Sequence, residues 1–224
     1  MAYRYAISDP HGCLDVFERA VAALDLSGDN VLYLLGDYIP HQSFDEDTEE
    51  WLDRCIASLA FVRELQVAHS EHVVTLLGNH ELMLLDQADW GHIELAPSLE
   101  RWLRDLRPFV ETERQIFVHA GVDEEAEDLW PWASEDSYFC SKVPPSFGHF
   151  EKDVIAGHVG APGLAGDPDF EGAYWDGASH YYIDGTTERT GRMTILRYDV
   201  ERGTYQQQVA TAQGVGELMP ILEH

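Results

Sequence analysis

The sequence is poor in cysteine and contains no long apolar run. Its 224 residues include three cysteines, at positions 13, 55 and 140, and no two of them form a C-x-x-C pair. Such sparse cysteines exclude a disulfide framework and fit a reducing compartment. No apolar run approaches the roughly 20 residues that a membrane-spanning helix needs, and the first residues lack the regions of a signal peptide. We therefore expect a cytoplasmic protein with no membrane partner.

Positive charge is also scarce. The chain carries 14 Lys and Arg residues against 41 Asp and Glu residues, which gives a formal net charge of -27. Nucleic acid and anionic lipid both require a basic surface, so neither is an expected partner. A phosphorylated substrate would be repelled at long range, which means that cations bound close to the reacting group must attract it.

Apolar side chains are plentiful, at 45% of the sequence, and aromatic ones make up 11%. In a chain of this length they are sufficient for one α/β domain with a sizeable core. No linker divides the chain. We therefore predict a single domain over residues 1–221 and interpret residues 222–224 as the remnant of an expression tag.

Short apolar runs alternate with helical patterns in the first ninety residues. Runs at 3–8, 31–35 and 73–77 predict buried strands, and helical spacing at 15–24 and 45–65 predicts helices between them. This β-α-β-α-β order predicts a parallel sheet with helices on both faces. Further along we expect helices at 81–86 and 98–106, a strand pair at 112–119, irregular structure at 123–128, 130–150 and 161–175, and strands at 153–156, 181–184, 193–198 and 204–210.

Each of the first three predicted strands ends in a cluster of metal-ligand residues. The clusters are Asp9-Pro10-His11-Gly12, Gly36-Asp37 and Gly78-Asn79-His80-Glu81. Residues just past the carboxyl ends of parallel strands converge on one crevice, which is the usual ligand site of an α/β sheet. Two later strands run into His119 and His158. Because mixed oxygen and nitrogen donors suit Mn, Fe or Zn, we predict a metal centre, most simply with two ions.

The residue types indicate how two ions would be held and used. Asp37 has two carboxylate oxygens and can bridge both ions, whereas Asn79 offers a neutral amide oxygen. Two ions roughly 3.5–4 Å apart can generate a hydroxide nucleophile near neutral pH and hold a phosphoryl group. His80 directly follows a predicted ligand, and we predict that it protonates the leaving oxygen.

These motifs, with His119-Ala120-Gly121 and Gly157-His158, resemble the ordered motifs of the calcineurin-like metallophosphoesterases. More narrowly, they resemble the bacterial and phage branch of the phosphoprotein phosphatases. The resemblance covers nearly the whole chain and implies a four-layer α/β/β/α sandwich. It further implies two divalent or trivalent metal ions, for which Mn is the first expectation and Fe and Zn are alternatives. It also implies the following roles: Asp9, His11 and Asp37 hold the first ion, Asp37, Asn79, His119 and His158 hold the second, and His80 is the general acid.

Two substrate-binding elements of that family are absent. The family continues Gly-Asp to Asp-Arg-Gly, whereas this chain has Pro40-His41-Gln42, and the arginine expected after Leu129-Trp130 is also missing. The carboxylate would orient and charge the general acid, and the arginines would grip phosphate in a bidentate way. Protonated His41 is a candidate substitute, and Lys142 and Arg192 are further candidate cations. We also consider a substrate contact for Tyr38 and expect core packing for Trp130 and Trp132.

Three functions stay open at this point. The first is a serine/threonine-type protein phosphatase, acting on a phosphorylated protein or a small phosphoester. The second is a dinucleoside polyphosphate hydrolase, whose substrate bases could stack on Trp or Tyr. The third is a relative that binds metal without turnover. The complete ligand set and the presence of His80 favour catalysis, and the motif resemblance places the protein phosphatase first.

Overall fold

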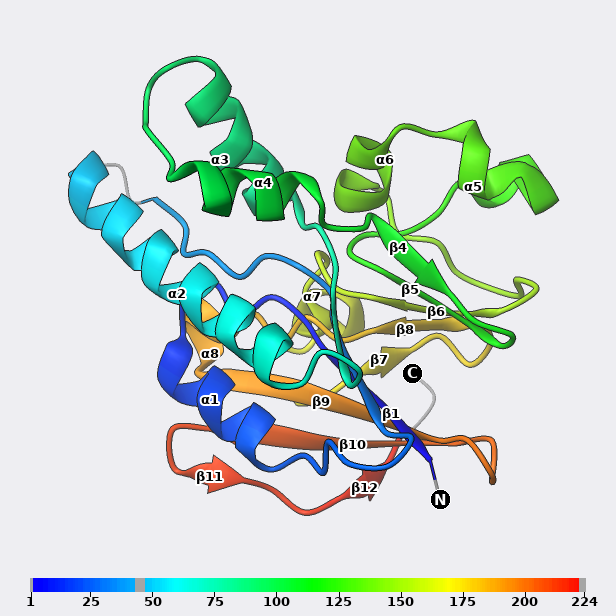
Figure 1. Ribbon diagram of the computed structural model, residues 1–224. Helices are drawn as coiled ribbons and strands as arrows, with labels where there is room; N and C mark the ends of the chain where they lie inside the picture. The colour runs from blue at the N-terminus through cyan, green and yellow to red at the C-terminus, as the bar shows by residue number, and fades with distance from the viewer. Residues whose placement is uncertain (1, 43–46, 222–224) are drawn as a thin grey trace.

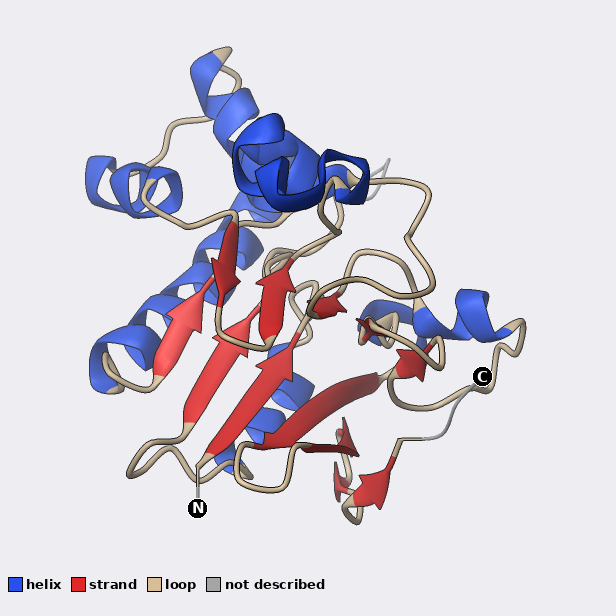
Figure 2. Ribbon diagram, turned by 90° about the vertical axis from the view of Figure 1, so that its right-hand side faces the viewer, coloured by secondary structure: helices blue, strands red, loops and turns tan. Residues whose placement is uncertain are grey.

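The computed structural model describes residues 2–42 and 47–221, so the predicted tag remnant at 222–224 lies outside the described residues. Two β-sheets pack against each other, and helices lie on their outer sides (Figures 1 and 2). Within the described part of the chain, no helix combines the length and apolarity that crossing a membrane requires.

The first sheet is mixed. Its strands, in spatial order, are β11 (Gly214–Val215), β10 (Thr204–Thr211), β9 (Arg192–Asp199), β1 (Tyr3–Ile7), β2 (Val31–Leu34) and β3 (Val73–Thr75), and β12 (Met219–Pro220) pairs with β10. The pairs β1–β2 and β2–β3 are parallel, whereas β9 runs antiparallel to β1. The strands of the second sheet, in spatial order, are β4 (Phe109–Glu111), β5 (Gln115–Val118), β6 (Asp153–Ala156), β8 (His180–Tyr182) and β7 (Tyr174–Trp175).

The helices follow the strands closely in the first half of the chain and are short in the second. They are α1 (Leu14–Ala22), α2 (Thr48–Ala68), α3 (Asn79–Asp89), α4 (Pro97–Arg104), the 3-10 helix η1 (Glu124–Leu129), α5 (Trp130–Ala133), α6 (Asp136–Ser141), α7 (Ala161–Ala165) and α8 (Thr187–Thr190). The order β1-α1-β2-α2-β3 confirms the predicted parallel unit.

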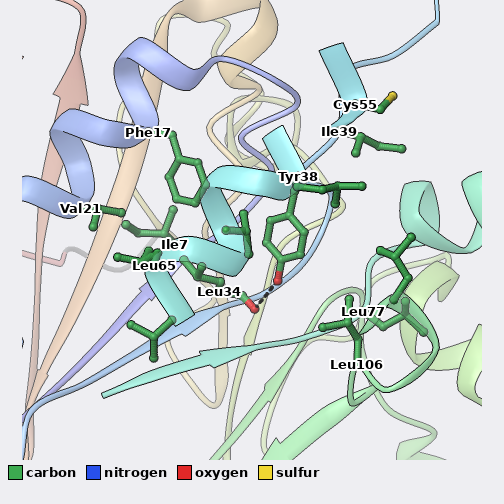
Figure 3. Packing of buried hydrophobic residues seen from close by; sticks show 14 of the residues in the cluster. Ile7, Phe17, Val21, Leu34, Tyr38, Ile39, Cys55, Leu65, Leu77 and Leu106 are labelled. Atoms are coloured by element: carbon green, nitrogen blue, oxygen red, sulfur yellow. Dashed lines mark hydrogen bonds between the residues drawn. The ribbon is translucent and has the colours of Figure 1, made fainter. Parts of the chain in front are cut away.

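The two faces of the first sheet are covered by different layers. Leu32 and Leu34 of β2 pack with side chains of α1 and α2, among them Phe17 (Figure 3). The alternate residue Tyr33 faces the second sheet, where its ring stacks on Phe117 with 3.7 Å between centroids. The prediction of helices on both faces is therefore wrong, because the second sheet replaces one helical layer. The result confirms the four-layer α/β/β/α sandwich.

The outer face of the second sheet is covered by α5 and α6. Trp130 is 1% exposed and packs against Phe109 and Phe139, which confirms its predicted core role. Trp132 is 79% exposed, so the same prediction was wrong for it. The two residues lie in one short helix, and only one of its faces meets the sheet.

Several predicted boundaries changed. The first strand of the predicted pair at 112–119 lies earlier, at β4, because residues 112–114 form the turn into β5. The segments expected to be irregular contain η1, α5, α6, α7 and the short strand β7, and the sequence analysis did not predict α8. These elements are two to six residues long, too short for a hydrophobic period to be visible.

Tyr38 is a core residue, contrary to the suggested substrate contact. It is 1% exposed, and its hydroxyl oxygen lies 3.0 Å from the backbone carbonyl of Leu34 and 2.8 Å from that of Leu76, which are the two acceptors for its single proton. Figure 3 shows the contact with Leu34. The ring thereby joins the ends of β2 and β3 beneath the loop that carries Asp37.

Candidate metal centre

The loops after β1 and β2 lie side by side and carry three of the predicted ligands. The backbone N–H of His11 donates to the carbonyl of Asp37 (3.0 Å), and the N–H of Gly12 donates to the carbonyl of Tyr38 (3.0 Å). Because β1 and β2 are parallel neighbours, both loops leave the same edge of the sheet. Asp9, His11 and Asp37 therefore converge as the sequence predicts.

The backbone is strained at four predicted ligands. Six non-glycine residues in the described ranges have a positive φ, and four of them are Asp9 (54°), His11 (41°), Asp37 (56°) and His158 (63°). Such conformations cost about 1–3 kcal/mol per residue and persist only where surrounding contacts impose them. Their concentration at these positions is typical of a functional site.

Two glycines allow the loops to approach each other closely. A Cβ atom on Gly157 would overlap with the Ser8 hydroxyl and the Asp9 carboxylate, and one on Gly78 would overlap with the Asp37 backbone and carboxylate. Any side chain at either position would push an aspartate out of place. The motif glycines are therefore required by the close packing of the site.

The histidine rings are oriented by backbone carbonyls. Nδ1 of His11 lies 3.3 Å from the Ile39 carbonyl, and Nδ1 of His119 lies 3.0 Å from the Leu35 carbonyl. An Nδ1–H that donates to a carbonyl leaves Nε2 with its lone pair toward the site, as in metal-ligating histidines. Both Nε2 atoms face Asp37, at 3.7 Å for His11 and 3.4 Å for His119.

The predicted ligands form two groups that share one aspartate. Within each group the ligand atoms lie within 4.8 Å of one another, and the groups are Asp9, His11 and Asp37, and Asp37, His119 and His158. Asn79 adjoins the second group, because its Oδ1 lies 2.9 Å from Nε2 of His119. This division is the one that the family resemblance implies, with Asp37 common to both groups.

The buried carboxylates of this cluster need positive charge close by. Asp9 and Asp37 are 1% and 2% exposed, and Oδ1 of Asp9 has no hydrogen-bond partner among the described residues. Burial raises the pKa of Asp9 to about 7, although His119 opposes the shift. Burial disfavours a charged His119, but the Asp37 and Asp9 carboxylates outweigh it and raise the pKa of His119 to about 10. In the chain alone, a proton on His119 supplies the charge that the carboxylates require.

The donor set fits a divalent transition-metal ion. When Nδ1 of His119 donates to a carbonyl, its Nε2 and the nearby Oδ1 of Asn79 are both acceptors, and only a proton or a metal cation can lie between them. The unpartnered Oδ1 of Asp9 is a second free acceptor. Imidazole, amide and carboxylate donors in one crevice suit Mn, Fe or Zn.

His80 and His41 lie at the edge of the cluster. The backbone N–H of His80 donates to Oδ1 of Asp37 (2.9 Å), and its ring Nε2 lies 3.8 Å from Oδ2 of the same residue. The ring centroid of His41 is 4.3 Å from that of His80 and 4.3 Å from that of His11. The structure therefore brings both sequence-predicted histidines to the metal-ligand cluster.

Both of these histidines favour the neutral form. Burial lowers the pKa of His80 to about 4, and the Asp37 charge opposes the shift only in part. Burial and the nearby His11 lower the pKa of His41. Among the described residues no carboxylate accepts a hydrogen bond from the His80 ring, so the aspartate missing from the family motif is not replaced there. The lowered pKa of His41 disfavours the protonated form that a phosphate ligand requires.

The other candidate cations are engaged elsewhere. Nζ of Lys142 donates to the Pro144 carbonyl (3.1 Å) and the Ser146 hydroxyl (2.7 Å). Arg192 pairs with Glu171, at 3.1 Å. Neither side chain takes the place of the missing arginines in this conformation.

Glu81 is a residue whose role the sequence analysis missed. It is 0% exposed, and its carboxylate accepts the backbone N–H groups of Asp37 (2.8 Å), Tyr38 (2.8 Å) and Gly78 (3.1 Å). It therefore fixes the start of α3 to the strained loop of Asp37. The signal that could have revealed it is its position three residues after the N-cap Gly78, where a glutamate closes a capping box.

Known proteins resemble the chain in sequence and in structure. Over 131 residues it is 33% identical to a protein of Burkholderia thailandensis named bis(5'-nucleosyl)-tetraphosphatase, symmetrical; the match covers 52% of this chain and 41% of that protein. A protein of Delftia acidovorans with the same name is 28% identical over 152 residues, covering 59% of this chain and 47% of its own length. The chain thus spans about half the length of these curated relatives.

Among solved structures, a protein serine/threonine phosphatase from Saccharomyces cerevisiae is 11% identical, with a TM-score of 0.56 over 100% of this chain and 81% of that chain. At this identity the likeness shows the fold and not the substrate. The sequence profile of the calcineurin-like phosphoesterases matches residues 5–199. That range contains every residue of the cluster described above, and the chain belongs to the calcineurin-like phosphoesterase family.

Proposed function

We propose that this chain is a two-metal phosphoester hydrolase whose substrates are dinucleoside polyphosphates. The observation that carries the reaction class is the position of Asp37, shared by two groups of donors at the crevice where the β1 and β2 loops meet. Two bound ions would supply an activated water and stabilise charge on the transferring phosphoryl group. Mn is the first metal to test, with Fe and Zn as alternatives.

His80 is the proposed general acid. Its backbone is anchored on Asp37, and its ring lies at the edge of the donor cluster, where a leaving oxygen can reach it. Its pKa of about 4 in the chain alone is too low for a proton donor at neutral pH. A bound phosphate adds negative charge beside the ring and favours the protonated form. We therefore expect His80 to become a donor when substrate is bound.

A dinucleotide substrate is supported by the names of the curated relatives, which describe tetraphosphatases. The sequence motifs favoured a phosphorylated protein as the substrate, and that preference is not confirmed. A lone phosphate monoester depends on the arginine that His41 has replaced, because a bidentate contact is its main source of affinity. A polyphosphate offers additional charged groups along its length, so that contacts elsewhere can compensate. The low cysteine content, three in 224 residues, supports the proposal of a reducing, cytoplasmic setting for this reaction.

The first experiment tests metal dependence and substrate together. Metal-stripped protein is assayed before and after addition of Mn, with p-nitrophenyl phosphate, diadenosine tetraphosphate and a phosphoserine peptide as separate substrates. We expect Mn-dependent turnover with the highest kcat/KM for the dinucleotide. A higher kcat/KM for the phosphopeptide would contradict the proposed substrate and restore the protein phosphatase. No turnover of any substrate with Mn bound would favour the non-catalytic relative.

The second experiment tests the role of His80. In His80→Ala we expect kcat to fall by about 10²–10⁴-fold, the usual contribution of a general acid, while the bound Mn stays at the wild-type level. His149→Ala is the matched control, because His149 is exposed and outside the cluster. Full turnover in His80→Ala would refute the assigned role, and a loss of bound Mn would mean that His80 is a ligand.

A further inference from the structure

A cavity of about 670 Å³ opens beside the metal-ligand cluster, between α7 and α8. One wall begins at Val159 and Gly160, directly after the predicted ligand His158, and the other is formed by Thr186 and Arg189. This volume lies within the range of small-molecule sites, roughly 300–1,000 Å³. No residue of the cavity belongs to the two groups of predicted ligands.

The cavity is firmly connected to the metal-ligand cluster. The backbone N–H of His158 donates to Oδ2 of Asp9 (3.1 Å), so the loop that forms one wall is anchored on a predicted ligand. Gly160 packs so tightly against Thr186, the residue before α8, that an added Cβ would lie 2.6 Å from Cγ2 of that threonine. A ligand in the cavity would therefore lie next to a phosphate at the metal-ligand cluster.

Arg189 is the basic side chain among the residues that line this cavity. Its side chain is 77% exposed, and its ion-pair contact is with its neighbour Glu188, at 3.7 Å, longer than a hydrogen bond. The backbone N–H of Arg189 donates to the carbonyl of Thr186 (2.9 Å), which fixes the base of the side chain on α8. The charged group of Arg189 is therefore available to a ligand, whereas those of Lys142 and Arg192 are engaged by other residues.

The remaining residues that line the cavity give it an apolar part and an acidic part. Pro162 and Pro168 offer apolar surface. Asp167 adds one carboxylate, whose Oδ1 accepts the backbone N–H of Asp169 (2.9 Å). A phosphate is therefore expected on the side of Arg189, away from Asp167, and an uncharged base or ribose against the prolines.

We propose that this cavity is a second substrate subsite, which holds the distal phosphate and nucleoside of a dinucleoside polyphosphate while Arg189 contacts the distal phosphate. The proposal rests on the proposed function and deepens it, because a substrate with two ends uses both the metal centre and the cavity. It also explains how a chain of net charge -27 retains a polyanionic substrate without the arginines of its family.

The test compares a two-ended and a one-ended substrate. For Arg189→Gln we expect the ratio of kcat/KM for diadenosine tetraphosphate to kcat/KM for p-nitrophenyl phosphate to fall roughly tenfold or more, through KM, since a charge-assisted phosphate contact is lost. For Arg189→Lys this ratio should lie between those of the wild type and Arg189→Gln, because lysine keeps the positive charge but cannot make a bidentate contact. Arg101→Gln, an exposed arginine on α4, should leave both substrates at wild-type rates. An unchanged ratio in Arg189→Gln overturns the proposal.

A binding measurement separates this proposal from the proposed function. Calorimetry with adenosine diphosphate and Mn-loaded protein should show roughly tenfold weaker binding in Arg189→Gln and none of this loss in Arg101→Gln. If the wild type cleaves none of the substrates but binds the nucleotide through Arg189, the subsite stands and the proposed function fails. If the dinucleotide is cleaved and neither measurement responds to Arg189, the subsite fails and the proposed function stands. Absence of both turnover and nucleotide binding refutes both.

Discussion

Replacing Glu81 with alanine should release the loop that carries Asp37. The Glu81 carboxylate is fully buried and accepts three backbone N–H groups from two separate segments, the β2 loop and the start of α3. One of those N–H groups belongs to Asp37 itself, whose φ is 56°. Without this acceptor, nothing in the described contacts replaces the bonds that hold the strained loop in place.

The magnitude follows from these three contacts. Burial raises the pKa of Glu81 to about 7, so its carboxylate is charged in mildly alkaline solution, where the measurement is made. Removing one partner of a buried charged network costs about 3–5 kcal/mol. We therefore expect Glu81→Ala to lower the free energy of unfolding by about 3–5 kcal/mol, where a typical protein has a total of 5–15 kcal/mol. Glu81→Gln keeps one carbonyl oxygen. With that oxygen facing Asp37 and Gly78, only the Tyr38 N–H loses its acceptor, for a loss of about 1–3 kcal/mol.

Urea unfolding in EDTA, followed by tryptophan fluorescence, measures these losses without a contribution from metal binding. Glu71→Ala is the matched control, because Glu71 is exposed in the turn before β3. In addition, Glu81→Ala should weaken Mn binding by about 10–100-fold, as expected for residues that orient ligands. The reasoning is refuted if the free energy of unfolding of Glu81→Ala lies within about 1 kcal/mol of the wild-type value. It is also refuted if Glu81→Gln is as unstable as Glu81→Ala.

Three further predictions concern metal, core and pH. Mn at 100 times its Kd should stabilise the metal-free protein by about 2.7 kcal/mol per ion, or roughly 5–10 °C in Tm, and an unchanged Tm in calorimetry would contradict the site. Trp130→Ala should cost about 3–5 kcal/mol in urea unfolding, whereas Trp132→Ala should stay within about 0.5 kcal/mol, because only Trp130 is buried. Burial opposes a charged His180, but Glu124 and Asp176 outweigh it and raise its pKa. The stability that this charge contributes is fully present below the unfolded pKa, near 6.5, and is lost as pH rises through the raised folded value. The difference in unfolding free energy between wild type and His180→Gln should therefore shrink from pH 6 to pH 9, and a constant difference would contradict this account.

The architecture was largely predictable, because the informative signals are local. Apolar runs at 3–8, 31–35 and 73–77 coincide with β1, β2 and β3, and each is followed by the motif that enters the site. The face that the second sheet covers could not be predicted in this way. Both a helix and a sheet bury alternate residues of β2 equally well, so the pattern of burial alone does not tell which layer packs on Tyr33.

The sequence predicted which residues form the candidate site, but not the contacts that hold them in place. Asp9, His11, Asp37, Asn79, His80, His119 and His158 all gather as predicted, because strand order brings their loops to one edge. Glu81, the orientation of the histidine rings by backbone carbonyls and the free position of Arg189 were not predicted. The first two depend on contacts between segments distant in sequence. The α8 helix has only four residues, and no periodic signal marks it.

The sequence by itself determined which chemistry the chain can perform, because residue type and position after a strand specify the donors and the edge where they meet. Only the tertiary structure decided how the donors are held and what surrounds them. Ring orientation and the strained backbone depend on contacts between the segments that follow β1, β2, β3 and β5. Such contacts form only once the chain has closed on itself, and a local sequence pattern does not encode them.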